Sequence, residues 1–358
     1  MDAIQLGVCL HSPWCRKLCP YCDFAVETGP QHDAYLAAIL LELARRARVR
    51  GRAGVDLPRR RHTVTVATRR ITRAVEAIVA HYGRRPTEVT IEANPTDCGA
   101  ENLAAWGAAG ISRVSIGVQS TDPEALVRLG RDHRFGDGTR AVERTQQAGF
   151  ATSADFIFGT PGARDLPIDL LPDHLSVYEL TIEDRTAFGQ RVRDGRLVPL
   201  DEDTLAERYV AIHDRLTAVG YEHYEISSYA RPGKRAVHNS LYWQGAPFLG
   251  LGVSAASLQL RPDGSAVRAT NPRRSVTYLA DPGAAAEVAT IGAAEMAADR
   301  AWLGMRTSDG VPLTGLPSGV VPWLEAERLA ERRGDRMCPT LRGFLMADTI
   351  AARIIEGW

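Results

Sequence analysis

The sequence predicts an α/β fold with a parallel sheet, followed by a smaller and mostly helical C-terminal domain. Short apolar or β-branched segments alternate with helix-like segments from residue 4 to about residue 219, a pattern typical of parallel strands joined by crossover helices. After about residue 230 the alternation gives way to a stretch rich in aromatic residues and glycine. The chain has 358 residues, 45% of them hydrophobic, which is enough for one large and one small domain without disulfides.

The alternating elements can be placed in chain order. Apolar side chains recur at helical spacing along residues 35–43, and they alternate along residues 111–118 as in a strand. The expected strands cover residues 4–10, 62–66, 88–93, 111–118, 151–158 and 174–180. The expected helices cover residues 35–43, 70–81, 101–109, 122–129, 139–148 and 205–219, with C-terminal helices at 324–333 and 341–355. Loops are expected at residues 51–61, which are basic, and at residues 261–285, which hold prolines, glycines and charges.

The charge balance favours no class of macromolecular partner. Lys plus Arg and Asp plus Glu number 43 each, so no bulk charge indicates nucleic acid or a membrane surface. No apolar run approaches the roughly 18–20 residues that would span a bilayer. The N-terminus lacks the basic start and apolar stretch of a signal peptide. We therefore expect a cytoplasmic protein whose thiols stay reduced.

Three of the six cysteines lie within eight residues, at Cys15, Cys19 and Cys22. Such short steps let one loop wrap its thiolates around a metal centre, and soft thiolates select zinc, copper(I) or iron–sulfur clusters. A structural zinc site normally has four ligands, and His11 is the upstream candidate for a fourth. Three cysteines instead suit a 4Fe–4S cluster that leaves one iron open to a small molecule. The other three cysteines, Cys9, Cys98 and Cys338, are isolated, and cysteines of that kind usually serve as small buried hydrophobic residues.

The spacing of these cysteines resembles the motif of the radical S-adenosylmethionine (SAM) superfamily. The match is specific, because the loop lies directly after a first strand and before a helix. In that superfamily the open iron binds the amino and carboxylate groups of SAM. An electron from the cluster then cleaves SAM to methionine and a 5′-deoxyadenosyl radical. The resemblance implies a partial parallel barrel of six units, (β/α)6, with a C-terminal domain. We place the core in residues 1–228 and the C-terminal domain in residues 229–358.

Other segments are similar to the oxygen-independent coproporphyrinogen III oxidase family, and more closely to its HemW-type heme-chaperone branch. The oxidases carry a further cysteine where this chain has Phe24. HemW-type proteins carry a His-Asn-x-x-Tyr-Trp motif, which this chain matches at residues 238–243. The similar segments follow the family's order and are His11-Ser-Pro-Trp-Cys15, Cys19-Pro-Tyr-Cys22-Asp-Phe24, Ile91-Glu92-Ala-Asn-Pro95, Ser115-Ile-Gly-Val-Gln119, Leu129-Gly-Arg131-Asp-His133, Asp155-Phe-Ile-Phe-Gly159-Thr-Pro161-Gly162, Asp173-His-Leu-Ser-Val-Tyr-Glu-Leu180 and Tyr224-Glu-Ile-Ser-Ser-Tyr229.

The resemblance implies that four residues contact SAM, namely Glu92, Gln119, Arg131 and Asp155. Carboxylates suit the hydroxyl and ammonium donors of such a molecule, and an arginine suits its carboxylate. Without the family, Glu92 would simply end a strand and Arg131 would be a solvated cation at a helix end.

The resemblance also implies a heme contact at His238, with Tyr242 and Trp243 beside it. A neutral imidazole is a common iron ligand, and flanking aromatic rings can pack on a porphyrin face. Without the family, His238 would be interpreted as a hydrogen-bonded surface histidine.

The chain departs from the family at three places. It lacks a Gly-Gly-Gly-Thr-Pro segment after the second strand, where it has Ala-Thr-Arg-Arg70, and arginines cannot let backbone approach a ligand as glycines do. Only fifteen residues, three of them prolines, connect Gly159 to Asp173, so one barrel helix is expected to be missing. Cys9 stands where the family usually has a tyrosine that helps to hold SAM. A diverged member with weakened SAM binding and a gene model with deleted segments both fit these departures.

We therefore expect a HemW-type protein that binds heme and a 4Fe–4S cluster and passes heme to acceptor proteins. Its partners would be heme or a porphyrin, the acceptor proteins and, where radical chemistry occurs, an electron donor. No nucleic-acid partner is expected. The alternative from the enzyme class is oxidative decarboxylation of coproporphyrinogen III. A further alternative is a degenerate or structural-metal protein without turnover.

Overall fold

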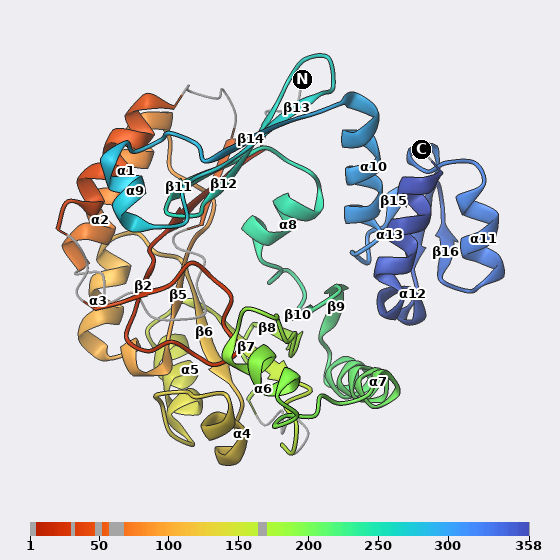
Figure 1. Cartoon of the computed structure of the whole chain (residues 1–358), viewed down its shortest axis with the longest axis horizontal. Helices are drawn as coiled ribbons and strands as arrows, with labels where there is room; N and C mark the ends of the chain where they lie inside the picture. Colours follow the sequence, from red (N-terminus) through yellow and green to blue (C-terminus); the bar gives the residue numbers. More distant parts are fainter. Residues whose placement is uncertain (1–4, 30–32, 47–51, 57–67, 164–169, 358) are drawn as a thin grey trace.

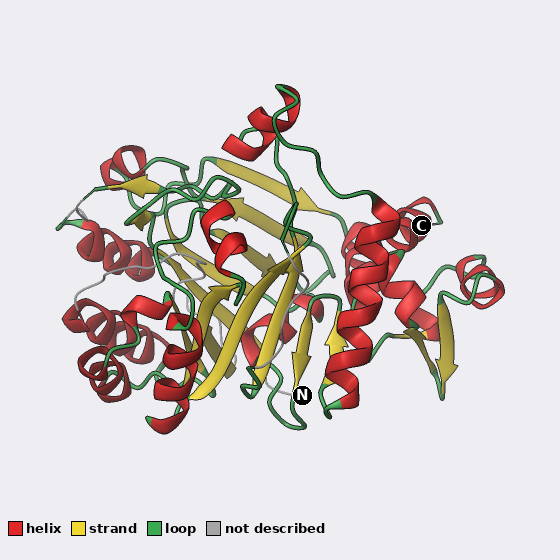
Figure 2. Ribbon diagram, turned by 90° about the horizontal axis from the view of Figure 1, so that it is seen from below, coloured by secondary structure: helices red, strands yellow, loops and turns green. Residues whose placement is uncertain are grey.

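An open, curved sheet of twelve strands forms the centre of the molecule (Figure 1). The computed structural model describes residues 5–29, 33–46, 52–56, 68–163 and 170–357. The strands follow the order β14-β13-β12-β11-β1-β4-β5-β6-β7-β8-β10-β9, so β14 and β9 are the edges of the described sheet. Helices of the first half cover the outer face of the sheet, and helix α8 lies on its inner side, facing the C-terminal elements (Figures 1 and 2).

Six parallel strands, β1 and β4 to β8, form the core of this sheet and confirm the predicted partial barrel. Alternation explains the two faces of β6, where Val114, Ile116 and Val118 are buried in the apolar core while Arg113 and Ser115 line an inner pocket. The elements are β1 (Gln5–His11), α1 (Tyr35–Arg45), β4 (Arg52–Asp56), α2 (Thr68–Tyr82), β5 (Val89–Ala93), α3 (Ala100–Ala108), β6 (Arg113–Gln119), α4 (Pro123–Arg128), α5 (Asp137–Gln147), β7 (Ala151–Phe158) and β8 (His174–Glu179).

Later segments extend the sheet at both of its sides. Strand β11 pairs in parallel with β1, and β12 to β14 continue antiparallel from it. Strands β10 and β9 add antiparallel pairs next to β8. The sheet therefore contains residues from both sides of position 228. These elements are α6 (Ala187–Arg193), α7 (Glu202–Ala218), β9 (Glu222–Glu225), β10 (Ser228–Ala230), α8 (Val237–Trp243), β11 (Phe248–Gly252), β12 (Ala256–Leu260), β13 (Ala266–Thr270), α9 (Ser275–Ala280) and β14 (Glu287–Ile291).

The C-terminal region is mostly helical, as predicted, and carries its own apolar core (Figure 1). Met305, Leu324, Ile350 and Ile354 are buried at the centre of this core. A small sheet in the order β15-β17-β16 accompanies the helices. The elements are α10 (Ala293–Gly304), β15 (Val311–Pro312), α11 (Val320–Ala326), β16 (Ala330–Arg333), β17 (Arg336–Pro339), α12 (Leu341–Leu345) and α13 (Ala347–Glu356). Within the described ranges, no helix combines the length and the apolarity that a bilayer span requires.

Three local predictions were wrong. Residues 51–61 do not form only a loop, since Arg52–Asp56 is strand β4 and pairs with β1 on one side and β5 on the other. The helix predicted at 324–333 ends at Ala326, because Ala330–Arg333 pairs with β17 instead. Residues 261–285 include β13 and α9.

Two further predictions concern segments that lie wholly or partly outside the described residues. The strand predicted at residues 62–66 lies outside the described residues. Between β7 and β8, the described residues 159–163 and 170–173 contain no helix.

Candidate functional site

The three clustered cysteines lie on a loop that directly follows β1. Cys15 belongs to β2 (Trp14–Cys15), which pairs with β3 (Glu27–Thr28) and closes the loop at its base. The Cys22 N–H donates to the Cys19 carbonyl over 3.1 Å. Cys15 and Cys19 are buried, and Cys22 is partly exposed. The loop thus presents its thiols at the carboxyl end of the first barrel strand, where functional loops of such folds gather.

Arg131 lies buried beside this loop and is not a solvated cation. Its guanidinium donates to Cys19 Sγ over 3.8 Å, to Asn94 Oδ1 over 2.7 Å and to the Gly117 carbonyl over 3.0 Å. Burial raises the pKa of the Cys19 thiol, and the positive charge of Arg131 opposes that rise. Arg131 therefore stabilises negative charge at one of the three clustered cysteines.

Residues that anchor the cysteine loop were missed in the sequence. Arg16, between two of the cysteines, forms an ion pair with Asp97 and donates to Thr96 Oγ1 over 3.2 Å. Asp97 lies in a short 3-10 turn after β5, where its carboxylate accepts from the Asn94 N–H over 3.2 Å. Burial raises the pKa of Asp97 to about 6, with Arg16 opposing. The one local hint was the Asn-Pro pair, because Asn before Pro is a common helix start.

Gln119 ends β6 with a buried side chain and an unusual backbone. Its φ is +65°, in the left-handed region that non-glycine residues rarely adopt. Both Oε1 and Nε2 are buried, and neither has a hydrogen-bond partner among the described residues. A buried amide without a partner is costly, and strained backbone tends to occur at functional sites. Gln119 thus fits a bound molecule that supplies the missing hydrogen bonds.

The inner side of the sheet holds a polar pocket lined by Glu92, Asp155 and His238, among other residues. Asp155 accepts from Ser115 Oγ, at 3.1 Å and 3.2 Å from its two oxygens. Strand register brings these groups together, because β5, β6 and β7 are neighbours and Glu92 pairs with Ser115. The pocket therefore joins residues predicted for SAM with one predicted for heme. Gln119 does not line it.

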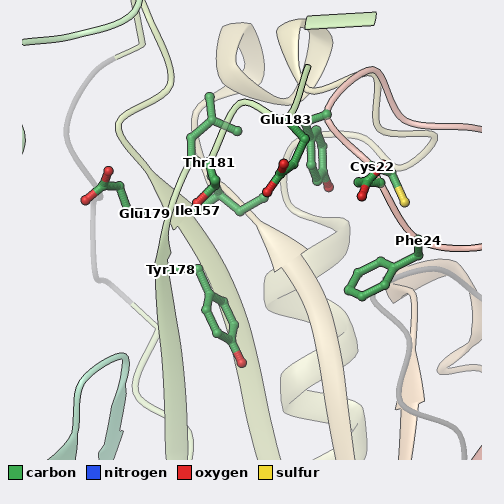
Figure 3. Close-up of a pocket in the computed structure, with 10 residues that line it drawn as sticks. Cys22, Phe24, Ile157, Tyr178, Glu179, Thr181 and Glu183 are labelled. Atoms are coloured by element: carbon green, nitrogen blue, oxygen red, sulfur yellow. The ribbon is translucent and has the colours of Figure 1, made fainter. Parts of the chain in front are cut away.

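A second pocket lies at the cysteine loop (Figure 3). Cys22 and Phe24 lie on one side of it, across from Tyr178 and Glu179 of strand β8 and from Thr181, two residues beyond that strand. Phe24 is 56% exposed. Tyr178 also lines the polar pocket, so it connects the cysteine loop with the inner side of the sheet.

The predicted heme motif lies on helix α8, but His238 and Trp243 line different pockets. His238 is 2% exposed and is not a surface histidine. Its Nε2 hydrogen-bonds to the Tyr242 hydroxyl over 2.9 Å. A side chain at Gly7 of β1 would crowd the His238 ring, which shows how closely the helix packs on that strand. Trp243 lines a different groove, between α8 and the C-terminal region.

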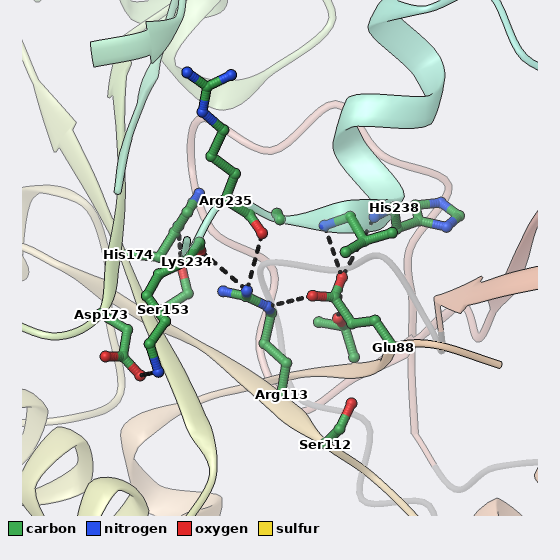
Figure 4. A network of polar contacts seen from close by, with 12 residues as sticks. Glu88, Ser112, Arg113, Ser153, Asp173, His174, Lys234, Arg235 and His238 are labelled. Atoms are coloured by element: carbon green, nitrogen blue, oxygen red, sulfur yellow. Dashed lines mark hydrogen bonds and ion pairs between the residues drawn. The ribbon is translucent and has the colours of Figure 1, made fainter. Parts of the chain in front are cut away.

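A buried ion pair fixes the start of α8 (Figure 4). Arg113 Nε donates to Glu88 Oε2 over 2.8 Å. Glu88 Oε1 accepts from the N–H groups of Val237 and His238 over 3.1 Å and 3.3 Å. Arg113 also donates to the carbonyls of residues 234 and 235 over 3.0 Å and 3.1 Å. Sequence reasoning missed this pair, which positions the helix carrying His238.

The zinc alternative depends on His11. Its buried ring hydrogen-bonds through Nδ1 to the Val253 carbonyl. In the part of the chain that the structure describes, no three His, Cys, Asp or Glu side chains are placed to hold one metal ion. That finding concerns single ions, because the cysteines of a 4Fe–4S cluster each bind a different iron.

The departures from the family pattern are partly visible. Cys9 lies on β1 beside Gly250 of β11 and is partly exposed. The segment that carries glycines in the family corresponds to residues 67–70 here. Position 67 lies outside the described residues, and helix α2 begins at Thr68.

Comparison with known proteins gives consistent matches. Residues 9–169 match the model of the Radical SAM superfamily. Heme chaperone HemW of Mycobacterium tuberculosis H37Rv is 33% identical, over 99% of this chain and 96% of that protein. Heme chaperone HemW of Escherichia coli K12 is 34% identical, over 76% of this chain and 75% of that protein.

The structural comparison agrees at the level of the fold. Coproporphyrinogen III oxidase (HemN) of Escherichia coli superposes with a TM-score of 0.76, covering 98% of this chain and 90% of that one at 18% identity. The alignment with the mycobacterial protein has 386 positions, more than the 358 residues of this chain. The chain therefore lacks residues that this relative has.

Proposed function

This chain belongs to the HemW-type family of radical SAM proteins, and from that membership we propose that it is a heme chaperone. It binds heme, a 4Fe–4S cluster and SAM, and it delivers heme to acceptor proteins. The observation that carries the proposal is the match over 99% of the chain to a protein named Heme chaperone HemW. Cysteine thiolates as cluster ligands suit the cytoplasm, where thiols stay reduced.

Cys15, Cys19 and Cys22 are the residues that would hold the cluster. When bound, a 4Fe–4S cluster supplies one-electron chemistry at its open iron, for which an electron donor is the implied partner. Arg131 stabilises negative charge on Cys19. Gln119 offers SAM both a donor and an acceptor that no described residue uses.

Two of the three carboxylates that line the polar pocket, Glu92 and Asp155, complete the proposed SAM site. Glu92 and Asp155 project from neighbouring parts of the sheet and suit hydroxyl or ammonium donors. Ser115 holds the Asp155 carboxylate in place.

Helix α8 is the proposed heme-binding element. His238 offers an imidazole, but ligation of iron through Nε2 requires that it give up the Tyr242 hydroxyl. Trp243 lines a groove and has an aromatic ring to pack against a porphyrin. The heme acceptor proteins are the corresponding macromolecular partners.

Anaerobic reconstitution followed by heme titration tests the proposal. We expect iron and sulfide in equal amounts in the wild type, and loss of both when Cys15 and Cys19 are changed to Ser. Hemin should change the visible spectrum of the wild type, and His238→Ala should weaken that change. His213→Ala, which alters a half-buried histidine of α7, is the matched control.

Three results would contradict the proposal. Bound zinc in place of iron would favour a structural-metal protein. Equal hemin spectra for wild type and His238→Ala would remove His238 from the heme site. Efficient formation of protoporphyrinogen from coproporphyrinogen, with release of 5′-deoxyadenosine from SAM, would favour the oxidase alternative.

A further inference from the structure

A groove between α8 and the C-terminal region gathers cationic side chains beside an aromatic ring. We call it the arginine groove and define it by Arg235, Trp243, Arg300, Asp309 and Arg336, which are among its lining residues. These residues come from α8 and the segment before it, from α10, from the loop that precedes β15 and from β17. The arginine groove shares no lining residue with the polar pocket.

The charges in this groove do not cancel. Arg235 is held by Asp309, at 3.0 Å from each carboxylate oxygen. Arg336 donates to the backbone carbonyls of Asp309 and Gly310, each over 2.7 Å. The carbonyls accept the hydrogen bonds of Arg336 but leave its positive charge without a carboxylate partner. The lining holds three arginines and one aspartate, and Glu222 adds a second carboxylate 3.3 Å from Arg235, so one positive charge stays uncompensated.

Arg300 is the arginine that remains available to a ligand. It is exposed on α10, and no described residue accepts a hydrogen bond from its guanidinium. Its stem crosses Gly245, where an added Cβ would lie 2.7 Å from Arg300 Cγ. Gly245 also has a φ of +62°, so glycine suits it on two counts. This glycine follows the Tyr242–Trp243 pair by two residues and lets the arginine approach the end of α8.

The aromatic ring of Trp243 indicates which kind of anionic ligand the groove would bind. It is half-buried and lines the groove with the arginines. A flat aromatic face beside unneutralised guanidinium groups suits a flat ligand that carries carboxylates, since rings stack and arginine binds carboxylate in a forked geometry. A porphyrin with propionate side chains has both features.

We propose that the arginine groove binds the propionate carboxylates of a porphyrin, with Arg300 as their direct partner and Trp243 packing against the ring. The assignment rests on the proposed heme function and adds a site for the carboxylate edge of the ligand. Because this contact involves no metal, an iron-free porphyrin depends on it as heme does.

Fluorescence titration with protoporphyrin IX tests the site. We expect Arg300→Gln to weaken binding about five- to tenfold, the effect of losing one charge-assisted hydrogen bond at an exposed site. Arg300→Lys should stay within about threefold of the wild type, because it keeps the charge. Arg342→Gln, which changes another exposed arginine of the C-terminal region, should leave binding unchanged. Protoporphyrin IX dimethyl ester, whose carboxylates are blocked, should bind wild type and Arg300→Gln equally.

The outcomes separate this inference from the proposed function. Suppose that the wild type binds hemin, and that Arg300→Gln binds both hemin and protoporphyrin IX as tightly as the wild type does. The proposal that the arginine groove binds propionates is then overturned, while the proposed heme function stands. If Arg300→Gln and Arg342→Gln weaken binding alike, the effect is general charge and the site is overturned as well. If the wild type binds neither porphyrin, the heme function itself fails.

Discussion

Gln119 combines two features that a folded chain normally avoids. Its backbone is left-handed and its buried amide has no partner among the described residues. Each is destabilising by roughly 1–3 kcal/mol. Their coincidence at the end of a barrel strand is understandable if the protein gains from the amide only when a ligand is bound.

Gln119→Met separates these effects, because it keeps the length of the side chain and removes its polar atoms. We expect the free energy of unfolding of the apoprotein to rise by about 1–2 kcal/mol, since an unsatisfied amide is replaced by an apolar group. SAM should then give the reconstituted variant little of the thermal stabilisation that it gives the wild type. Urea denaturation and thermal melting with and without SAM measure the two results. Gln147→Met, at an exposed position of α5, is the control. A variant that loses stability and keeps SAM binding would contradict the assignment.

The cysteine loop could be predicted from the sequence because its three cysteines lie within eight residues. The side chains that hold it could not. Arg16 and Asp97 are 81 positions apart, and Arg131 and Cys19 are 112 apart. Such pairs depend on how the sheet brings loops together, which no local pattern records. The separation of His238 and Trp243 onto different pockets likewise depends on where α8 packs.

Helix α8 has only seven residues and owes its position to its surroundings. Glu88 and Arg113, 7% and 5% exposed, bind the backbone at its start. Because the pair is buried, removing one partner leaves an uncompensated charge, which typically costs about 3–5 kcal/mol. The pair thus links the residue before β5 and the first residue of β6 to the helix that carries His238.

A double-mutant cycle on this pair tests that link. Glu88→Leu and Arg113→Leu should each lower the free energy of unfolding by about 3–5 kcal/mol. The double variant should lose clearly less than the sum, because neither charge is then left buried alone. Arg332 and Glu325 form an exposed pair at 2.6 Å, and their cycle should give a coupling below about 1 kcal/mol. Additive losses at Glu88 and Arg113, measured by urea denaturation, would show that the two residues act independently.

Most core elements could be predicted because their apolar periodicity is strong. Strand β7 has the predicted bounds, and α7 differs from prediction by a few residues. Strand β4 was missed because Arg52–Asp56 contains a single β-branched residue and is a strand by pairing with two neighbours. Strand β16 was missed for the same reason, since its polar sequence pairs with β17. Pairing between distant segments overrides weak local preference.

Across the whole molecule, several histidines are buried in neutral form. The rings of His133, His174 and His223 are each less than a tenth exposed. Burial lowers the pKa of His133 to about 4 and the pKa values of His174 and His223 to about 3. In the unfolded chain these groups titrate near 6.5. Asp97 works in the opposite sense, because burial raises its pKa to about 6.

These shifts predict that acid destabilises the fold well before carboxylates titrate. Below pH 6.5 the unfolded chain binds protons at the three histidines while the folded chain does not, so the free energy of unfolding falls as pH falls. Each histidine lowers the free energy of unfolding by up to about 1.4 kcal/mol for each pH unit of acidification. Below pH 6, protonation of Asp97 in the folded chain raises that free energy by a similar amount. We expect a net loss of about 3–5 kcal/mol between pH 7 and pH 5, measured by urea denaturation of the apoprotein.

His133→Gln is the variant that tests the origin of this loss. Its ring bonds the Val118 carbonyl through Nε2 over 3.0 Å, a contact that a glutamine amide can replace without titrating. The variant should lose a little under half of the net slope between pH 6.5 and pH 5, because one of three similar groups no longer binds a proton on unfolding while Asp97 still opposes the other two. Stability that is constant or rises from pH 7 to pH 5 in the wild type would mean that these histidines reach water in the folded protein.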